Sequence, residues 1–279
     1  MVPQTCKVIC NLTSGIAAHL SITRRWVYGT GLSAASKDGH SVYDPSRSNT
    51  SQKLENYSWK ITYGDGSGAS GDVFVDTVRV GTTIAKKQAL GAAETIIGSF
   101  HLEQNSDGLL GLGFDSLNTI TPIKQPTFFT NVKESLSAPL FTADLRKGKP
   151  GSFDFGFIDD EKYVGRISYI PVNNTRGFWE ITSESYAIGN GKYISTTLDG
   201  IVDSGTTLLL LPSAIVSIYY GKVTGARWDR VQGGYIFPCS TTLPSFTLRF
   251  GTYSAVIPGS YMKYAPISVG SQSKCFSFF

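Results

Sequence analysis

The sequence predicts an all-β protein, built mainly of strands with a few short helices. Glycine is abundant, with 30 residues, and Tyr, Phe, Ser, Thr and Val recur in short runs. This composition favours strands and turns over long helices. The length of 279 residues is sufficient for a sizeable core, organised as two domains or as one large β unit.

Short apolar runs bounded by turn residues indicate where the strands lie. The clearest runs are residues 59–63, 72–80, 167–172 and 201–211. Gly- and Asn-containing turns separate them at residues 64–71, 173–177 and 189–191. This spacing is typical of a protein rich in antiparallel strands.

Two short helices are also expected. The first follows Pro126 and would place on one face Phe129, Val132 and Leu136. The second follows Pro212 and Ser213 and would place on one face Ile215, Ile218 and Tyr219. Polar residues fill the opposite faces, which favours amphipathic helices over buried strands.

The net charge of +4 is confined to one end of the chain. Residues 1–37 contain four basic side chains and no Asp or Glu, and the remainder has equal numbers of basic and acidic residues. A nucleic-acid-binding face is therefore not expected. No apolar stretch reaches the roughly 18 residues of a membrane helix, and residues 1–10 lack the pattern of a secretion signal.

Cysteine and histidine usage bounds the chemistry. The four cysteines are Cys6, Cys10, Cys239 and Cys275. The residues alone do not decide whether Cys239 and Cys275 are free buried thiols or form a disulfide. Possible glycosylation triplets at Asn49, Asn56 and Asn173 favour a secreted protein, in which a disulfide is expected. The three histidines, His19, His40 and His101, lack metal-ligand spacing, so no metal or cofactor is expected. A Ser-His-Asp site is not excluded by count, but no motif supports it.

The most informative segment is IVDSGTTLLLLP, residues 201–212. An apolar run delivers Asp203 into a turn made by Ser204 and Gly205. A carboxylate between apolar runs needs donors, which the backbone at Gly205 and the hydroxyls of Ser204, Thr206 and Thr207 could supply. A capping aspartate is the alternative interpretation, but a surface turn would not need such long apolar flanks.

Two glycine-rich segments accompany it. Residues 59–81 predict a hairpin whose tip spans residues 63–68, and such a tip can fold over a cleft. An ordinary exposed hairpin is the alternative. Residues 106–114 read SDGLLGLGF; their glycines do not give the order of a nucleotide-binding loop.

In this order, the three segments resemble the pepsin family of aspartic endopeptidases, most of all the secreted fungal aspergillopepsins and penicillopepsins. The resemblance runs from about Trp26 to the C-terminus. It includes HSVYDPS at 40–46, DFGFID at 154–159, GFWEIT at 177–182 and GGYIFPCSTTLPSF at 233–246. It implies a bilobal pepsin-like fold, with an N-terminal lobe over residues 1–140 and a C-terminal lobe over 141–279.

The resemblance also implies residue roles. Asp203 would be the catalytic aspartate of the C-terminal lobe, and Trp26 would support a flap tyrosine. The substrate-binding residues would be Tyr63, Gly64, Asp65, Ser67, Ser204, Gly205 and Thr206. Cys239 and Cys275 match the family's disulfide. An acid at the position of Asp65 goes, in the fungal relatives, with acceptance of lysine before the cleaved bond.

The family needs a second aspartate, seven residues before the Trp-Val pair. Counting back from Trp26 leads to His19, and counting forward from residues 3–5 leads to Asn11. Neither is an acid, so we expect the first catalytic turn to be missing and this chain to be inactive. We also expect a fold incomplete at both ends, with residues 1–25 anomalous and the C-terminal lobe truncated. A peptide-binding pseudoprotease is the alternative.

The resemblance implies a polypeptide substrate, a monomeric state and an extracellular location. It implies hydrolysis at acid pH, because two adjacent carboxylates share one proton and together activate a water.

Overall fold

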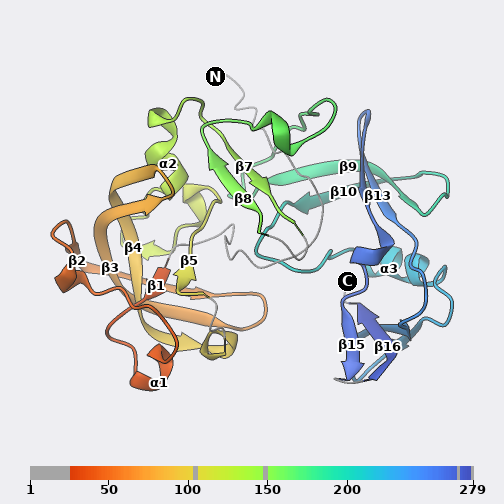
Figure 1. The fold of residues 1–279 in the computed structure, drawn as a ribbon, viewed down its shortest axis with the longest axis horizontal. Helices are drawn as coiled ribbons and strands as arrows, with labels where there is room; N and C mark the ends of the chain where they lie inside the picture. The colour runs from red at the N-terminus through yellow and green to blue at the C-terminus, as the bar shows by residue number, and fades with distance from the viewer. Residues whose placement is uncertain (1–25, 103–105, 147–149, 269–270, 278–279) are drawn as a thin grey trace.

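The computed structural model describes residues 26–102, 106–146, 150–268 and 271–277 (Figure 1). Strands dominate, as the composition predicts, and the arrangement is mainly β. The predictions made for Asn11, His19, Cys6 and Cys10 lie outside the described residues.

The N-terminal lobe is built on a six-stranded sheet of order β5-β1-β4-β3-β2-β6. Its strands are β1 (Trp26–Tyr28), β2 (Gln52–Thr62), β3 (Gly68–Val80), β4 (Thr83–Ile97), β5 (Gly108–Leu109) and β6 (Ile120–Thr121). The short strand β1 runs parallel to β4 and antiparallel to β5. Trp26 therefore sits inside the sheet, opposite Gly91 on one side and Leu109 on the other.

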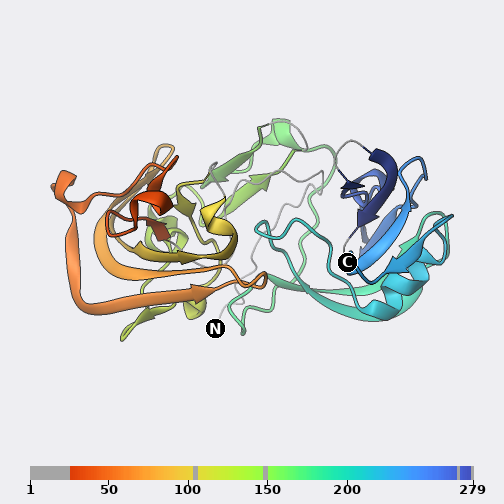
Figure 2. The ribbon, with the colours of Figure 1, turned by 90° about the horizontal axis from the view of Figure 1, so that it is seen from below.

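The C-terminal lobe contains two four-stranded sheets. The first has the order β10-β9-β13-β14, with β9 (Glu180–Ile188), β10 (Ile194–Ile201), β13 (Phe246–Phe250) and β14 (Tyr253–Ile257). The second has the order β11-β12-β16-β15, with β11 (Arg227–Asp229), β12 (Gly234–Pro238), β15 (Ala265–Ser268) and β16 (Ser271–Ser277). A two-stranded sheet of β7 (Phe141–Asp144) and β8 (Ser152–Phe155) lies between the lobes (Figure 2).

The helices are short. The α-helices are α1 (Ala34–Lys37), α2 (Phe128–Val132) and α3 (Ser213–Tyr220). Single turns of 3-10 helix cover Pro45–Arg47, Gly98–His101, Asp115–Leu117, Lys133–Ser135, Asp160–Lys162 and Gly259–Tyr261. Both predicted helices are present, but their buried faces differ in detail. Phe128 rather than Phe129 is fully buried in α2, and Ile218 in α3 is 44% exposed.

The strand predictions were correct for the hairpin and wrong for two other runs. Residues 59–63 and 72–80 fall on β2 and β3, which pair as a hairpin. Residues 167–172 form no strand, and the run at 201–211 is a strand only at Ile201. Neither residues 167–172 nor residues 202–211 form a ladder with a described strand, and an apolar run without a paired neighbour does not become a strand.

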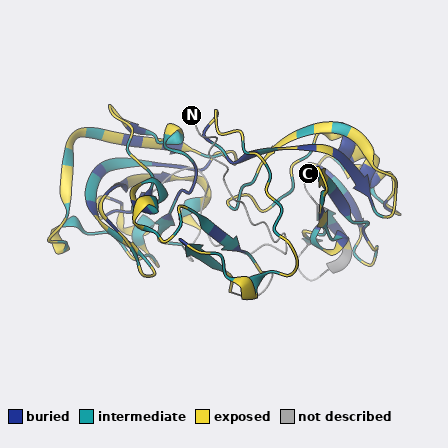
Figure 3. Ribbon diagram, turned by 90° about the horizontal axis from the view of Figure 1, so that it is seen from above, coloured by how far each residue is buried: buried dark blue, intermediate teal, exposed yellow. Residues whose placement is uncertain are grey.

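Each lobe has its own core (Figure 3). In the N-terminal lobe, Trp26, Tyr28 and Trp59 lie at the centre of the buried cluster. In the C-terminal lobe, α3 packs its buried residues against β9, β12 and β13. The boundary at residue 140 stays a prediction, since Phe155 of β8 packs against a cluster that contains Phe128 of α2.

Candidate active site

The β2–β3 hairpin ends in the tip at residues 63–67, which extends from the N-terminal lobe toward the other lobe (Figure 2). The backbone N–H of Tyr63 donates to the carbonyl of Ser67 at 2.8 Å, and that of Gly66 donates to the carbonyl of Tyr63 at 3.1 Å. Gly66 adopts φ +83°, a conformation that favours glycine. The glycines of this segment therefore close a tight turn.

Two aromatic residues contact the side chain of Tyr63. The indole Nε1 of Trp26 donates to the hydroxyl of Tyr63 at 3.0 Å. The ring of Phe100 packs edge-on against Trp26 at 4.9 Å and against Tyr63 at 5.4 Å. Because Trp26 is 0% exposed, this donor has a fixed position, and the pair predicted from the resemblance is in contact.

The carboxylate of Asp65 is also engaged at the hairpin tip. Its Oδ1 accepts from the backbone N–H of Ser67 at 3.0 Å and from the hydroxyl of Ser67 at 2.6 Å. Its Oδ2 accepts from the hydroxyl of Ser99 at 3.1 Å. The hydrogen bonds from Ser67, and then that from Ser99, hold the pKa of Asp65 below its usual value despite partial burial.

Sequence reasoning missed Ser99 and Phe100, which lie in the 3-10 turn Gly98–His101. This turn supplies one contact to Asp65 and one to Tyr63. Nothing in the sequence around Gly98 forms a motif, and the two contacts span more than 30 residues. The turn reaches the hairpin tip because it follows β4, which pairs with β3 up to Ile97 opposite Gly68.

Asp203 lies in the C-terminal lobe, in the loop between β10 and α3. The backbone N–H of Gly205 donates to Oδ1 at 2.8 Å, and the hydroxyl of Thr206 donates to Oδ2 at 2.6 Å. Asp203 and Ser204 are half-buried, whereas Thr207 is exposed. Each carboxylate oxygen thus has a local donor and keeps an acceptor direction for a further group.

The cysteine pair predicted from the resemblance is bonded. Cys239 and Cys275 form a disulfide that joins the end of β12 to β16, where Phe237 and Cys275 are opposite each other. The two cysteines are 36 positions apart in the sequence. Cys275 belongs to the same hydrophobic cluster as the buried residues of α3.

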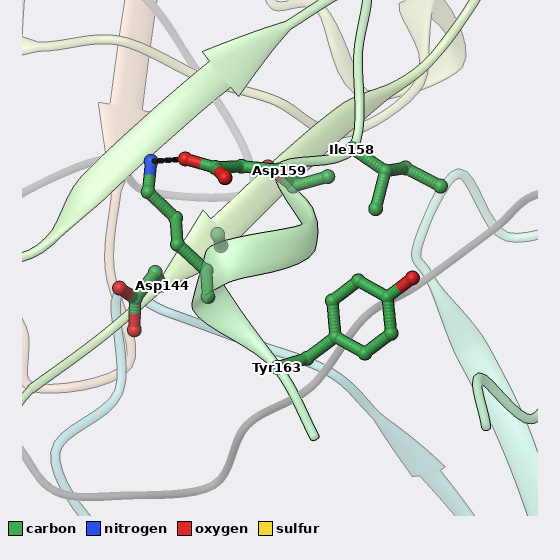
Figure 4. Close-up of a pocket in the computed structure, with 7 residues that line it drawn as sticks. Asp144, Ile158, Asp159 and Tyr163 are labelled. Atoms are coloured by element: carbon green, nitrogen blue, oxygen red, sulfur yellow. Dashed lines mark ion pairs between the residues drawn. The ribbon is translucent and has the colours of Figure 1, made fainter. Parts of the chain in front are cut away.

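A surface cavity lies away from these residues, near β7 (Figure 4). It is lined by Thr142, Ala143, Asp144, Ile158, Asp159, Lys162 and Tyr163. Lys162 pairs with Asp154 at 2.6 Å and with Asp159 at 3.5 Å, and Asp144 pairs with Arg146 at 2.6 Å. Its charges are therefore paired within the protein, and no predicted site residue lines it.

Among the described residues, no group of three or more His, Cys, Asp or Glu side chains is placed to hold a metal ion. No helix in the described ranges is both long and apolar enough to cross a membrane.

The family model for eukaryotic aspartyl proteases matches residues 23–279. The chain belongs to this family. It is 51% identical over 251 residues to penicillopepsin-3 of Penicillium janthinellum and 50% identical over 251 residues to endothiapepsin of Cryphonectria parasitica. These matches cover 90% of this chain but 63% and 60% of the relatives, so the chain spans less than two thirds of their length.

A solved structure supports the same assignment. The aspartic proteinase from Irpex lacteus superposes with a TM-score of 0.74 at 25% identity, covering 92% of this chain and 76% of the other. The pepsin-like fold expected from the sequence is thereby confirmed.

Proposed function

We propose that this chain derives from an aspartic endopeptidase that hydrolyses peptide bonds of polypeptides at acid pH. Asp203 is one of two carboxylates that share a proton and activate a water. The observation that carries the proposal is the Asp203 turn. Its carboxylate is held by Gly205 and Thr206 and remains partly accessible, as a proton-sharing general base requires.

The hairpin tip takes the role of a flap in this proposal. Tyr63 closes over the peptide and is positioned by Trp26. Gly64 and Asp65 line the binding site from the hairpin side. Ser67, which is 3% exposed, acts through its two hydrogen bonds to Asp65. Ser204, Gly205 and Thr206 contact the peptide from below. Exclusion of water by such a closing segment strengthens the electrostatic interactions with the reacting groups.

This chain itself is proposed to be inactive. Residues 1–37 contain no Asp or Glu, so the partner that must share a proton with Asp203 is missing. We further propose that the protein is extracellular and monomeric. The Cys239–Cys275 disulfide supports an oxidising compartment.

A hybrid chain tests the proposal. In the hybrid, the family's segment that carries Asp-Thr-Gly ahead of the Trp-Val pair replaces residues 1–25, and the family's C-terminal segment is added after Phe279. We expect peptide hydrolysis at acid pH from the hybrid, blocked by pepstatin, and none from the unaltered chain. Asp203→Asn in the hybrid should reduce kcat at least about 1,000-fold, the order seen when a charge-stabilising catalytic group is removed.

Retention of a tenth of the activity in the hybrid Asp203→Asn would remove Asp203 from the mechanism. Circular dichroism and thermal unfolding of the two hybrids serve as the control for folding. Pepstatin-sensitive hydrolysis by the unaltered chain would show that His19 or another group replaces the missing aspartate.

A further inference from the structure

The turn after residue 172 contains an acceptor triplet for N-linked glycosylation. Residues 173–175 read Asn-Asn-Thr, and glycosylation requires Asn-X-Ser/Thr at the surface. The part of the chain that the structure describes holds two more such triplets, beginning at Asn49 and Asn56. All three asparagines are exposed, so exposure alone does not distinguish them.

The triplet at Asn173 differs in its internal contacts. The backbone N–H of Thr175 donates to Oδ1 of Asn173 at 3.1 Å, and the Thr175 hydroxyl donates to the same oxygen at 2.8 Å. Contacts between residues i and i+2 need no tertiary fold and form in a short peptide. The acceptor oxygen is thus occupied while the amide Nδ2 is directed away from Thr175.

The hydroxyls of the other two triplets serve the fold instead. The hydroxyl of Ser51 lies 2.8 Å from that of Tyr43, beside the buried Asp76. The hydroxyl of Ser58 lies 3.5 Å from that of Thr121 on the neighbouring strand β6.

We propose that Asn173 is an N-glycosylation site and that it is modified in preference to Asn49 and Asn56. The inference rests on the extracellular location proposed above. The co-reactant is a lipid-linked oligosaccharide diphosphate of the secretory pathway. Nδ2 forms a bond to C1 of the first sugar, the C1–O bond to the lipid diphosphate breaks, and Nδ2 loses one of its two protons.

The folded structure is compatible with the product. The backbone N–H of Asn173 donates to the carbonyl of Glu180 at 2.8 Å, so the main chain of the turn is fixed independently of the side chain. The glycosylated amide keeps its Oδ1, and both bonds from Thr175 persist after modification. The sugar projects into solvent from an exposed position.

The test uses the full chain with a cleavable secretory leader, translated in the presence of microsomes. Treatment with a peptide:N-glycosidase in ¹⁸O-water hydrolyses the glycosylated side-chain amide and converts each formerly modified asparagine to ¹⁸O-labelled aspartate, and peptide mass spectrometry gives the occupancy of each site. We expect the highest occupancy at Asn173. Asn173→Gln and Thr175→Ala should abolish that label, whereas Thr175→Ser, which keeps the hydroxyl, and Asn174→Gln should retain it.

An unlabelled Asn173, or occupancy no higher than at Asn49 and Asn56, would overturn the proposal. Because the leader is supplied and no peptidase activity is measured, this result is independent of the hybrid experiment. The same chain translated without microsomes should carry no label at any site.

Discussion

The tip of the β2–β3 hairpin and the Asp203 turn are held by different kinds of contact. Tyr63 depends on Trp26, which is 37 positions away in the sequence. Asp203 depends on donors two and three positions further along the chain. The carboxylate of Asp203 is therefore fixed by a short motif, whereas Tyr63 is fixed only once the six-stranded sheet has formed.

The largest stability effect should come from Trp26, which positions the side chain of Tyr63. Trp26→Ala should lower the free energy of unfolding by about 3–5 kcal/mol, because it empties the centre of a packed core. Trp228 is the matched control. It is 54% exposed at a hairpin of the other lobe, and Trp228→Ala should cost below about 1 kcal/mol. Denaturant unfolding followed by circular dichroism measures both.

The disulfide provides the corresponding long-range restraint in the C-terminal lobe. Replacing both Cys239 and Cys275 with serine should lower stability by about 4 kcal/mol, the loop-closure value for a loop of this size. Thermal unfolding of the double variant beside the unaltered chain measures the loss. An unchanged midpoint would mean that α3 and its sheet hold the Asp203 loop without the disulfide.

A buried carboxylate in the N-terminal lobe should make stability depend on pH. Asp76 is 4% exposed and accepts bonds from the hydroxyls of Ser48, Thr50 and Tyr43 and from the N–H of Thr77. Burial alone would raise the pKa of Asp76, yet these donors outweigh it and hold the pKa below its usual value. Burial and the neighbouring Asp76 also raise the pKa of Tyr43 to about 12.

Because the pKa of Asp76 is lower in the folded state than in the unfolded state, ionised Asp76 stabilises the fold. The stabilisation is fully present above the unfolded pKa of about 3.9 and is lost as pH falls through the lower folded value. Asp76→Asn should cost about 1–3 kcal/mol near neutral pH. The difference from the unaltered chain should shrink below pH ~4. A difference that stays constant down to pH ~2 would contradict the assignment.

The smallest expected effect concerns substrate specificity at the tip of the β2–β3 hairpin. In the hybrid, Asp65→Ser should lower the ratio of kcat/KM for Lys over Leu peptides several-fold, since an exposed ion pair contributes up to about 1 kcal/mol. The lowered pKa of Asp65 keeps its charge into the acid range. Ser99→Ala removes one donor, so the Lys preference should disappear at a higher pH. An unchanged ratio in Asp65→Ser would refute the role.

Motifs with local geometry were predictable from the sequence, and contacts set by the sheet were not. The β2–β3 hairpin and both helix positions followed from glycine placement and apolar spacing. Ile218 was misassigned because α3 buries Ile215, Val216, Tyr219 and Tyr220, a stripe turned away from that residue.

The run at 202–211 failed as a strand prediction for a physical reason. A strand forms only beside another strand that accepts and donates its backbone hydrogen bonds. The hydrophobicity of the side chains does not show whether such a strand lies beside the run. Leu209 and Leu211 still pack against the core of the lobe, while Leu210 is 66% exposed. Apolar runs predict burial more reliably than pairing.

Residues 108–114 contact both the strand that carries Trp26 and the residues that precede β9. Residues 108–109 form β5, which pairs with β1 at Trp26 and Val27. A few positions on, the carbonyl of Leu112 accepts from the indole of Trp179 at 2.8 Å, and the N–H of Phe114 donates to the carbonyl of Gly177 at 3.0 Å. The segment thus ties the strand that carries Trp26 to the residues that lead into β9, so the position of Trp26 depends on contacts made far along the chain.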